Sequence, residues 1–506
     1  MNPKICLLNG FFLMTLVAAK FAYAESVSAP PTSVILKNAD NQYAQWNGIG
    51  KLHFNDIPHC TASLLDTRME NDHATGPAYL LTADHCVNFW VEELNDASNI
   101  SVKFNYFNDT HAQQKSYKVD KVSWARRPAM DLAVLELSVP LDTLLKDGIT
   151  PLKISADAGS LTGDILIVGA PQGDFTEPGL RLATCSQQKT NAALVEGHNV
   201  FPQTLKNNCI DQRGGASGSP VLDPETGKID SVLFTSTLGA TLTNICSVNN
   251  PCEVQGTHAF LAAETHYSSP VNALPACFVD GLFDLNSERC TLAPKTGLIV
   301  KNDHLPEKFR VPASPDEKAP SWGIRFSMEA PFYRFKTVRN AQSCYSPNHY
   351  SGIRSTTNAL IDEPIGREEG MYFLCLLGVQ SADHRPDARL FNSLKIIPAG
   401  LINKPFKRLP QPTLTFTPSP DNQHLHIEWH EASSHPFWTR VFEGEMAGRT
   451  CTELDPREFF REENTIRMPV DVLPYTLCSF IEDEDLNTSE IRTDVIQPPL
   501  VQSPLP

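Results

Sequence analysis

The 506-residue sequence has no Cys-x-x-Cys pair, no run of basic residues and, after its first 24 residues, no long apolar stretch. Cysteine pairs at that spacing are the usual start of a zinc site, so we expect neither a metal nor a cofactor. Lys and Arg number 42 against 58 Asp and Glu, for a net charge of −16. Phosphate recognition depends on Lys and Arg, which argues against a nucleic-acid partner. A membrane-spanning helix needs about 20 apolar residues, so we expect no integral membrane segment in the mature chain.

The first 24 residues have the features of a secretory signal peptide. They begin with a short cationic segment, continue with a mostly apolar run over 5–19, and end in Ala-Tyr-Ala, the small-x-small pattern that a signal peptidase cuts. An apolar run of this length is short for a membrane anchor. We therefore expect cleavage before Glu25 and a mature chain that is secreted or periplasmic.

The cysteine count agrees with export. Thirteen cysteines become twelve when Cys6 leaves with the signal peptide, and an even number in an exported chain favours a disulfide framework. Sequence alone does not prove connectivity. Pairing neighbours by position joins Cys60 with Cys86, Cys185 with Cys209, Cys246 with Cys252, Cys277 with Cys290, Cys344 with Cys375, and Cys451 with Cys478.

Short apolar runs broken by Gly, Pro, Asn and Asp predict an all-β protein of several domains. Beyond about residue 320, an aromatic run, a cysteine and a Tyr-x-Leu-Cys segment occur in that order twice. This weak repeat predicts two small β-sandwiches, each stapled by one disulfide. The predicted organisation is a signal peptide (1–24), a leader of loop character (25–45), a first domain (46–295), a linker (296–320), two sandwich modules (321–401 and 402–496) and a disordered Pro-rich tail (497–506).

Three segments of the first domain carry residues suited to catalysis. Leu-Leu-Thr-Ala-Asp-His-Cys puts His85 directly after an apolar strand, Asp-Leu-Ala-Val-Leu puts Asp131 at the head of another, and Gly-Gly-Ala-Ser-Gly-Ser-Pro puts Ser217 in a Gly-rich turn. Serine is a weak nucleophile, so it needs a base to take its proton and a carboxylate to orient that base. Glycine lets backbone N–H groups turn toward a developing oxyanion. Each motif alone is weak evidence, but together they meet these needs.

The three motifs, in the order His, Asp, Ser, resemble those of the chymotrypsin-fold (trypsin-like) serine peptidases. The resemblance covers roughly 46–265 and implies a double six-stranded β-barrel. It also implies that His85 is the general base and acid, that Asp131 orients it and that Ser217 is the nucleophile. The backbone N–H groups of Gly215 and Ser217 would form the oxyanion hole. The pair Cys60 and Cys86 matches the family's disulfide beside the histidine.

One departure from the animal trypsins concerns activation. Ala216 precedes the nucleophile where those enzymes carry an Asp that receives a freed N-terminal ammonium, and no Arg-Ile-Val-Gly-Gly activation site lies near residues 25–50. Activation is therefore not expected to need a new buried N-terminus. In this respect the chain is more similar to the bacterial secreted branch of the family.

Two assignments have rivals within the sequence. Asp84 adjoins His85 and competes with Asp131 for the carboxylate role, although a side chain rarely points at its own neighbour's ring. Asp211 stands six residues before the nucleophile, where trypsins carry the carboxylate that binds Arg or Lys side chains. Against that substrate-binding role, Arg213 replaces the family's usual cysteine and could neutralise Asp211, so a solvated loop aspartate is an equal alternative.

The sequence therefore predicts an exported serine endopeptidase that cleaves peptide bonds through a Ser-His-Asp acyl-enzyme mechanism. Its partners would be protein or peptide substrates, together with a surface or protein ligand of the C-terminal modules. The alternative is a catalytically silent peptidase-fold protein that acts in binding or adhesion through those modules, and a weaker one is an esterase with the same triad. Turnover that depends on Ser217 separates the first two.

Overall fold

The structure, a computed structural model, is all-β: beside short 3-10 turns, its described helices are α1 (Leu141–Lys146) and α2 (Ala388–Asn392). The predicted signal peptide, the leader before residue 32 and the tail after residue 497 lie outside the described residues. No helix in the described part of the chain is long and apolar enough to cross a membrane. The described residues are 32–68, 76–87, 97, 99–127, 129–157, 162–173, 175, 177–242, 245–293, 297–301, 308–381, 383–384, 388–430, 437–443, 448, 450–454, 459–462, 465–483 and 485–497.

The first barrel is a closed ring of six antiparallel strands in the order β2-β3-β4-β7-β6-β5. Its sequences suit this role because side chains alternate across a strand, and the inward positions are apolar. In β5, for example, Ile100, Val102 and Phe104 are buried while the residues between them are partly exposed. The strands are β2 (Ile49–Phe54), β3 (Ile57–Leu64), β4 (Pro77–Thr82), β5 (Ile100–Phe104), β6 (Lys115–Arg126) and β7 (Leu132–Pro140).

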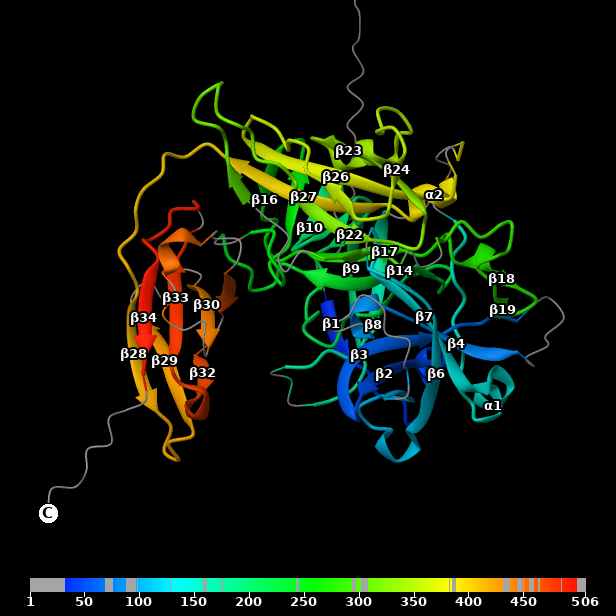
Figure 1. The fold of residues 1–506 in the computed structure, drawn as a ribbon. Coiled ribbons are helices and arrows are strands. Elements are labelled where there is room, and N and C mark those ends of the chain that lie inside the picture. Colours follow the sequence, from blue (N-terminus) through cyan, green and yellow to red (C-terminus); the bar gives the residue numbers. More distant parts are fainter. Residues whose placement is uncertain are drawn as a thin grey trace, which may run out of the picture.

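The second barrel also has six strands, and the pairing of β8 with β9 closes the ring β8-β9-β12-β17-β14-β13. The double six-stranded barrel expected from the sequence is thus confirmed (Figure 1). The leader was predicted to be a loop, but part of it is a strand: β1 (Thr32–Ile35) pairs with β9. The ring consists of β8 (Gly163–Gly169), β9 (Arg181–Lys189), β12 (Leu205–Asn207), β13 (Pro220–Leu222), β14 (Ile229–Ser236) and β17 (His266–Pro270).

A four-stranded sheet is inserted in the second barrel, in the order β11-β10-β15-β16. We call it the insertion sheet. Two of its strands come from the segment between β9 and β12, and two from the segment between β14 and β17. Sequence analysis did not anticipate it. Its strands are β10 (Ala193–Glu196), β11 (Asn199–Phe201), β15 (Cys252–Gln255) and β16 (His258–Phe260), and a separate hairpin of β18 (Phe278–Val279) and β19 (Leu282–Phe283) follows β17.

Two β-sandwiches follow the barrels, as predicted from the repeat. The first pairs a three-stranded sheet, β20 (Ile299–Val300), β22 (Ile324–Ser327) and β25 (Ala359–Ile361), with a five-stranded one, β21 (Lys308–Arg310), β27 (Lys395–Ile402), β26 (Gly370–Val379), β23 (Phe332–Val338) and β24 (Arg354–Ser355). The second pairs β28 (Thr413–Pro418), β29 (His424–His430) and β32 (Ile466–Pro469) with β31 (Phe460–Glu462), β30 (Phe437–Glu443), β33 (Tyr475–Ile481) and β34 (Arg492–Ile496).

The prediction that segment 296–320 is a linker is wrong for part of its length. In this segment β20 pairs with β22, and β21 pairs in parallel with β27, so these strands belong to the first sandwich. Short strands of two or three residues give little periodicity, which is why the polar, Pro-bearing sequence concealed them.

Disulfides join the twelve cysteines in the six neighbouring pairs proposed from the sequence. Four of these bonds lie in the first domain, and each sandwich holds one bond that ties a 3-10 turn to a central strand, β26 in the first and β33 in the second. The bonds join Cys60 to Cys86, Cys185 to Cys209, Cys246 to Cys252, Cys277 to Cys290, Cys344 to Cys375, and Cys451 to Cys478. Cys86 is the last residue of the turn that carries His85, and its bond to Cys60 ties that turn to β3. None of the twelve cysteines is among the residues that line the pocket described below.

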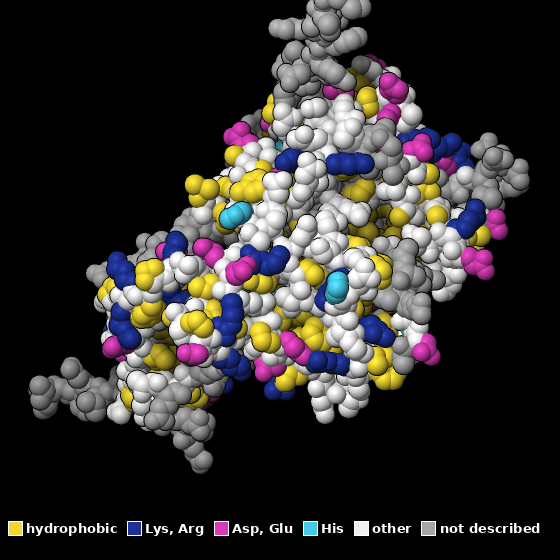
Figure 2. Space-filling view, turned by 90° about the horizontal axis from the view of Figure 1, so that it is seen from above, with side chains coloured by type: hydrophobic (Ala, Val, Ile, Leu, Met, Phe, Trp, Pro, Cys, Tyr) yellow, Lys and Arg dark blue, Asp and Glu magenta, His cyan; other side chains and the backbone are white. Residues whose placement is uncertain are grey.

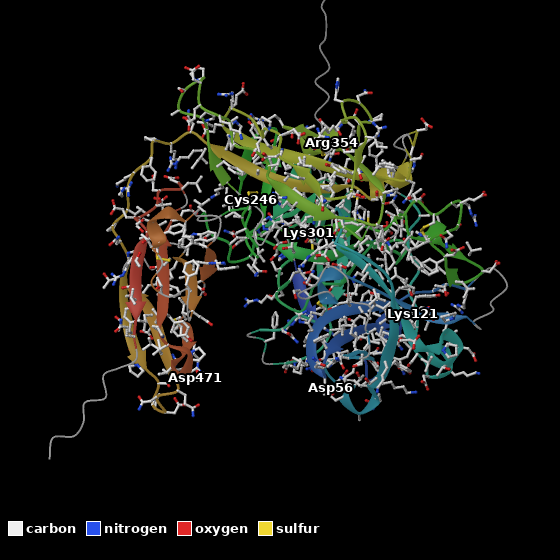
Figure 3. All side chains as sticks on the ribbon, viewed as in Figure 1. Asp56, Lys121, Cys246, Lys301, Arg354 and Asp471 are labelled. Atoms are coloured by element: carbon white, nitrogen blue, oxygen red, sulfur yellow. A yellow bond between two sulfur atoms is a disulfide. The ribbon has the colours of Figure 1, made fainter. Side chains whose placement is uncertain are left out.

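The first sandwich packs directly on the insertion sheet. A single buried apolar cluster contains Val195 and Val254 from the insertion sheet together with Phe373 and Leu377 from β26. Cys246 packs against this cluster and is labelled in Figure 3. Backbone hydrogen bonding continues across the junction, from Met371 N–H to the Thr257 carbonyl at 3.0 Å. The insertion sheet of the second barrel and the first sandwich therefore share a hydrophobic core.

The surface gives no sign of a single-sign charge field on the face shown in Figure 2, where Lys and Arg side chains are interspersed with Asp and Glu. Lys and Arg therefore do not form a continuous basic track on this face.

The shared core yields a stability prediction. Phe373 is fully buried in the cluster between sandwich and insertion sheet, so Phe373→Ala is expected to lower the free energy of unfolding by about 3–5 kcal/mol. Urea unfolding followed by tryptophan fluorescence measures this. Because the core is shared, barrels and sandwich are expected to lose stability together.

The matched control is Phe406→Ala, since Phe406 is 51% exposed and its loss is expected to change stability by no more than about 1 kcal/mol. An early transition confined to the sandwich, with the barrels unaffected by Phe373→Ala, would contradict a shared core.

Candidate active site

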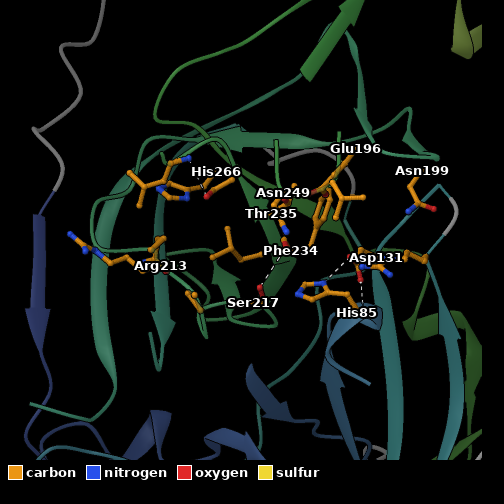
Figure 4. Close-up of a pocket in the computed structure, with 18 residues that line it drawn as sticks. His85, Asp131, Glu196, Asn199, Arg213, Ser217, Phe234, Thr235, Asn249 and His266 are labelled. Carbon is orange, nitrogen blue, oxygen red and sulfur yellow. Dashed lines mark hydrogen bonds and ion pairs between the residues drawn. The ribbon is translucent and has the colours of Figure 1, made fainter. Parts of the chain in front are cut away.

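A pocket of about 330 Å³ opens at the junction of the two barrels and is lined by residues of both. His85 comes from the 3-10 turn Asp84–Cys86 that follows β4, and Asp131 directly precedes β7. Ser217 lies in the loop that leads into β13. Figure 4 shows Ser217 and His85 facing each other across the pocket, with Asp131 behind the imidazole. The structure thus brings together the three residues predicted from separate motifs.

His85 and Asp131 form two hydrogen bonds. The imidazole Nδ1 lies 2.9 Å from Asp131 Oδ2, and the His85 backbone N–H donates to Oδ1, also at 2.9 Å. Asp131 is only 3% exposed, and its own N–H donates to the Ser269 hydroxyl at 3.3 Å. These contacts hold both the ring and the carboxylate in place. Asp84, the other carboxylate considered, is the first residue of the turn that carries His85.

The charges of the pair support each other. Burial alone would lower the pKa of His85, but the negative charge and hydrogen bond of Asp131 raise it above its usual value. Burial likewise opposes ionisation of Asp131, but His85 and Arg127 hold the pKa of the carboxyl below its usual range. An ionised Asp131 beside His85 is the arrangement that can stabilise a protonated imidazole.

The Ser217 hydroxyl donates to the Phe234 carbonyl at 3.5 Å. Hydrogen bonds between catalytic groups are often loose before substrate binds, so this contact does not exclude a partnership between Ser217 and His85. Gly218 in the same loop has φ +84°, and a Cβ there would lie 2.0 Å from the Thr61 carbonyl. Only glycine can occupy this position.

The loop around the nucleophile, residues 213–219, is fastened to the first barrel by Thr61. The Thr61 N–H donates to the Ser217 carbonyl at 2.8 Å, and its hydroxyl donates to the Gly215 carbonyl at 2.9 Å. Among the described groups, the N–H of Ala216 donates to the Arg213 carbonyl, whereas those of Gly215 and Ser217 have no acceptor. These two N–H groups are the donors that the resemblance assigns to an oxyanion hole.

Asp211 is not brought to the pocket. It has φ +63°, and its Oδ2 forms an ion pair with Arg181 Nη1 at 3.7 Å. The described lining of the pocket does not include it. Arg213, the other residue considered for neutralising it, lies 5.5 Å over the ring of Phe175. The structure therefore does not support a role for Asp211 as a carboxylate on the pocket floor.

Other polar residues line the pocket instead, and sequence analysis missed them. Gln212 and His266 are 2% and 4% exposed. Glu196, at the end of β10, accepts hydrogen bonds from the Thr235 hydroxyl at 3.2 Å and the Asn249 N–H at 3.0 Å. Burial raises the pKa of Glu196, and nearby His85 opposes this. The position of Gln212 beside the Ser217 motif was the one available signal, since the other two residues come from distant segments.

The described residues also include one group with metal-ligand atoms close together, Cys60, His85 and Cys86. Both cysteine sulfurs are held in one disulfide. Because cysteine binds a metal only as the free thiolate, this group offers a single imidazole and does not fit a metal ion.

Comparison with known proteins agrees with the geometry. Residues 68–229 match the family described as trypsin-like peptidase domain, a span that contains His85, Asp131 and Ser217. No curated protein matches the chain. The matched segment runs from the first barrel into the second, and both rings have the six strands of that fold. On this evidence, residues 68–229 are similar to the trypsin-like peptidase domain, and the two barrels have the chymotrypsin fold.

Proposed function

We propose that the protein is an exported serine endopeptidase. The observation that carries the proposal is the His85–Asp131 pair, hydrogen-bonded at 2.9 Å and facing Ser217 across a pocket between two barrels. This is the arrangement that activates a serine hydroxyl. The match to the trypsin-like peptidase domain supports peptide bonds as the target.

The proposed reaction uses groups of this chain throughout. Ser217 Oγ attacks the scissile carbonyl carbon while His85 Nε2 takes its proton, and the carbonyl oxygen becomes an oxyanion facing the N–H groups of Gly215 and Ser217. His85 then gives the proton to the leaving amine, and the C–N bond breaks to leave an acyl-serine. Water, deprotonated by His85, hydrolyses this ester and restores Ser217.

The catalytic proposal predicts serine-specific labelling. A fluorophosphonate probe is expected to label the chain 25–506 but not its Ser217→Ala variant, because the probe reacts only with an activated serine. Peptide turnover by the variant is expected to fall by about 10⁶-fold. A control variant, Ser355→Ala in the first sandwich, should be labelled like the parent.

Lack of labelling in a folded, disulfide-intact parent would contradict the catalytic proposal. The alternative is then a silent peptidase-fold protein that binds through its C-terminal modules. Labelling accompanied by ester cleavage without peptide cleavage would point to an esterase.

Export is proposed from the first 24 residues and from the six disulfides, since disulfides persist in oxidising compartments. The mature protein recovered from outside the cytoplasm is expected to begin at Glu25 by mass spectrometry. Ala24→Leu should block this cleavage, whereas Tyr23→Phe should not, because only the small positions are read. Recovery of a full-length chain with free thiols in the cytoplasm would count against export.

We further infer that the pocket favours an uncharged side chain with hydrogen-bond donors before the scissile bond. Gln212 Oε1 and His266 Nδ1 are buried and make no hydrogen bond within the described residues. Burial lowers the pKa of His266 to about 4, partly offset by a hydrogen bond to the Cys209 backbone. At pH 7 the ring is neutral, and its one N–H is used at Cys209, so Nδ1 is an acceptor.

The two buried acceptors, Gln212 Oε1 and His266 Nδ1, favour a substrate side chain that donates hydrogen bonds. Leaving each unpaired costs about 1–3 kcal/mol, and the NH₂ group of a carboxamide can donate to both without bringing a charge into the pocket. A Glu side chain has acceptors only, and a Lys side chain brings a charge that Asp211, paired with Arg181, is not placed to balance. Glutamine or asparagine is therefore the proposed preference.

This preference is tested with peptides that differ only in the residue before the scissile bond. Cleavage after Gln is expected to exceed cleavage after Glu or Leu by about 10–100-fold in kcat/KM, the effect of one or two buried hydrogen bonds. Gln212→Met should lower kcat/KM for the Gln peptide toward the value for the Leu peptide. Asp211→Asn should leave the order of kcat/KM among the peptides unchanged. The carboxamide preference is wrong if Lys peptides are cleaved fastest and Asp211→Asn abolishes that advantage.

A further inference from the structure

Lys51 is a buried lysine directly beneath the loop that carries the nucleophile. It lies on β2 and is 1% exposed. Its Nζ donates to the Ala170 carbonyl at 2.6 Å and lies 3.4 Å from the carbonyl oxygens of His59 and Gly215. A Cβ at Gly215 would lie 2.6 Å from this nitrogen. The ammonium thus reaches the backbone unit between the two proposed oxyanion donors.

No carboxylate balances this charge among the described groups that act on it. The titratable side chains that face Lys51 are His53 and His59. Burial lowers the pKa of both, that of His59 to about 4, so both rings are neutral at pH 7. Burying an ammonium without a counter-ion is costly unless its N–H groups are all used. Three carbonyl oxygens match the three N–H groups of a protonated lysine.

We propose that the Lys51 ammonium is a built-in positioning group that orders the oxyanion loop through the Gly215 carbonyl. The inference rests on the proposed peptidase function. Ala216 offers no carboxylate that could receive an ammonium from a new N-terminus. Lys51 supplies an ammonium from inside the first barrel, and it contacts backbone oxygens in place of an acidic side chain. The enzyme is then competent without cleavage of a propeptide.

The mechanism of ordering follows from the contacts. Gly215 has φ +84°, a conformation open to several orientations of the following peptide. Lys51 and the Thr61 hydroxyl both approach the Gly215 carbonyl, at 3.4 and 2.9 Å, and so fix that peptide. The N–H groups of Gly215 and Ser217 on either side are then held in place. Oxyanion donors stabilise a transition state only when they are preorganised.

The device is sensitive to pH in the neutral range. Burial lowers the pKa of Lys51 to about 7. Above this pH the amine keeps two N–H groups for three carbonyls and loses its charge, so the hold on Gly215 weakens and kcat falls. Stability changes in the opposite sense: between this pKa and that of the unfolded lysine, the unfolded state binds more protons, so the Lys51 contribution to stability rises with pH. Loss of activity over this interval is therefore not unfolding.

The experiment compares the chain 25–506 with Lys51→Met and Lys51→Gln. Lys51→Met keeps the length of the side chain and removes its donors, and kcat is expected to fall by about 10²-fold with KM changed less than about threefold. The alkaline limb of the parent's kcat profile, near pH 7, is expected to disappear, while the acid limb set by His85 remains. Lys51→Gln retains two N–H groups and should give an intermediate loss.

The matched control is Lys336→Met in the first sandwich. Lys336 is also buried, at 7% exposure, and its Nζ donates to the Ser346 and Asn348 carbonyls at 2.7 and 3.0 Å. Its replacement removes a comparable buried ammonium far from the nucleophile, so kcat and the pH profile are expected to stay as in the parent. If replacing any buried lysine by methionine lowered kcat, both Lys51→Met and Lys336→Met would show the loss.

Amide hydrogen exchange over residues 213–219 provides a readout that needs no turnover. The exchange rate is expected to rise by about tenfold or more in Lys51→Met and to stay unchanged in Lys336→Met. If the parent shows no turnover, the peptidase proposal fails, and exchange alone then supports or overturns the role of Lys51. The inference is overturned by unchanged exchange in Lys51→Met, or by a parent kcat that stays level from pH 7 to 9.

Discussion

Thr61 joins the two barrels at the point where the site needs them to meet. Its backbone N–H and its hydroxyl both hold the nucleophile loop, its hydroxyl accepts from the Ala170 N–H at 3.0 Å, and its carbonyl accepts from the Thr82 hydroxyl at 2.8 Å. Thr82 lies at the end of β4, directly before the turn that carries His85. One fully buried residue therefore connects the strand that leads to His85 with the loop that carries Ser217. Since each barrel supplies only part of the machinery, this junction sets the distance between the parts.

Several polar groups around this junction bond to the backbone. Lys51 contacts three carbonyls, and Asp131 accepts from a backbone N–H as well as from the imidazole. Backbone partners cannot rotate away or titrate, so they keep their geometry over a wide range of conditions.

The parts of the site that sequence analysis predicted are those that depend on local segments. His85, Asp131 and Ser217 each sit beside an apolar strand within a recognisable run of residues, and the strands bring them together. Glu196 and His266 could not be found this way, because β10 pairs with β15 and β12 with β17 across long stretches of chain. Asp211 shows a related limit. Its spacing from Ser217 fits a pocket residue, but its backbone is left-handed, its carboxylate pairs with Arg181, and the described pocket lining does not include it. Spacing fixes the position along a loop but not the path that the loop takes.

The first sandwich was expected to be a separate module, but its β26 shares a core with the insertion sheet, which carries Glu196 into the pocket. The second sandwich is attached differently, through polar contacts such as Arg310 with Asn487 at 2.9 Å and Lys404 with Asp485 at 2.5 Å. This contrast bears on how the chain can be rearranged in evolution. Recombination can gain, lose or exchange the second sandwich at little cost to the rest. The first sandwich and the barrels are inherited as one unit, because a chain that lacked the sandwich would expose the apolar face of the insertion sheet to solvent.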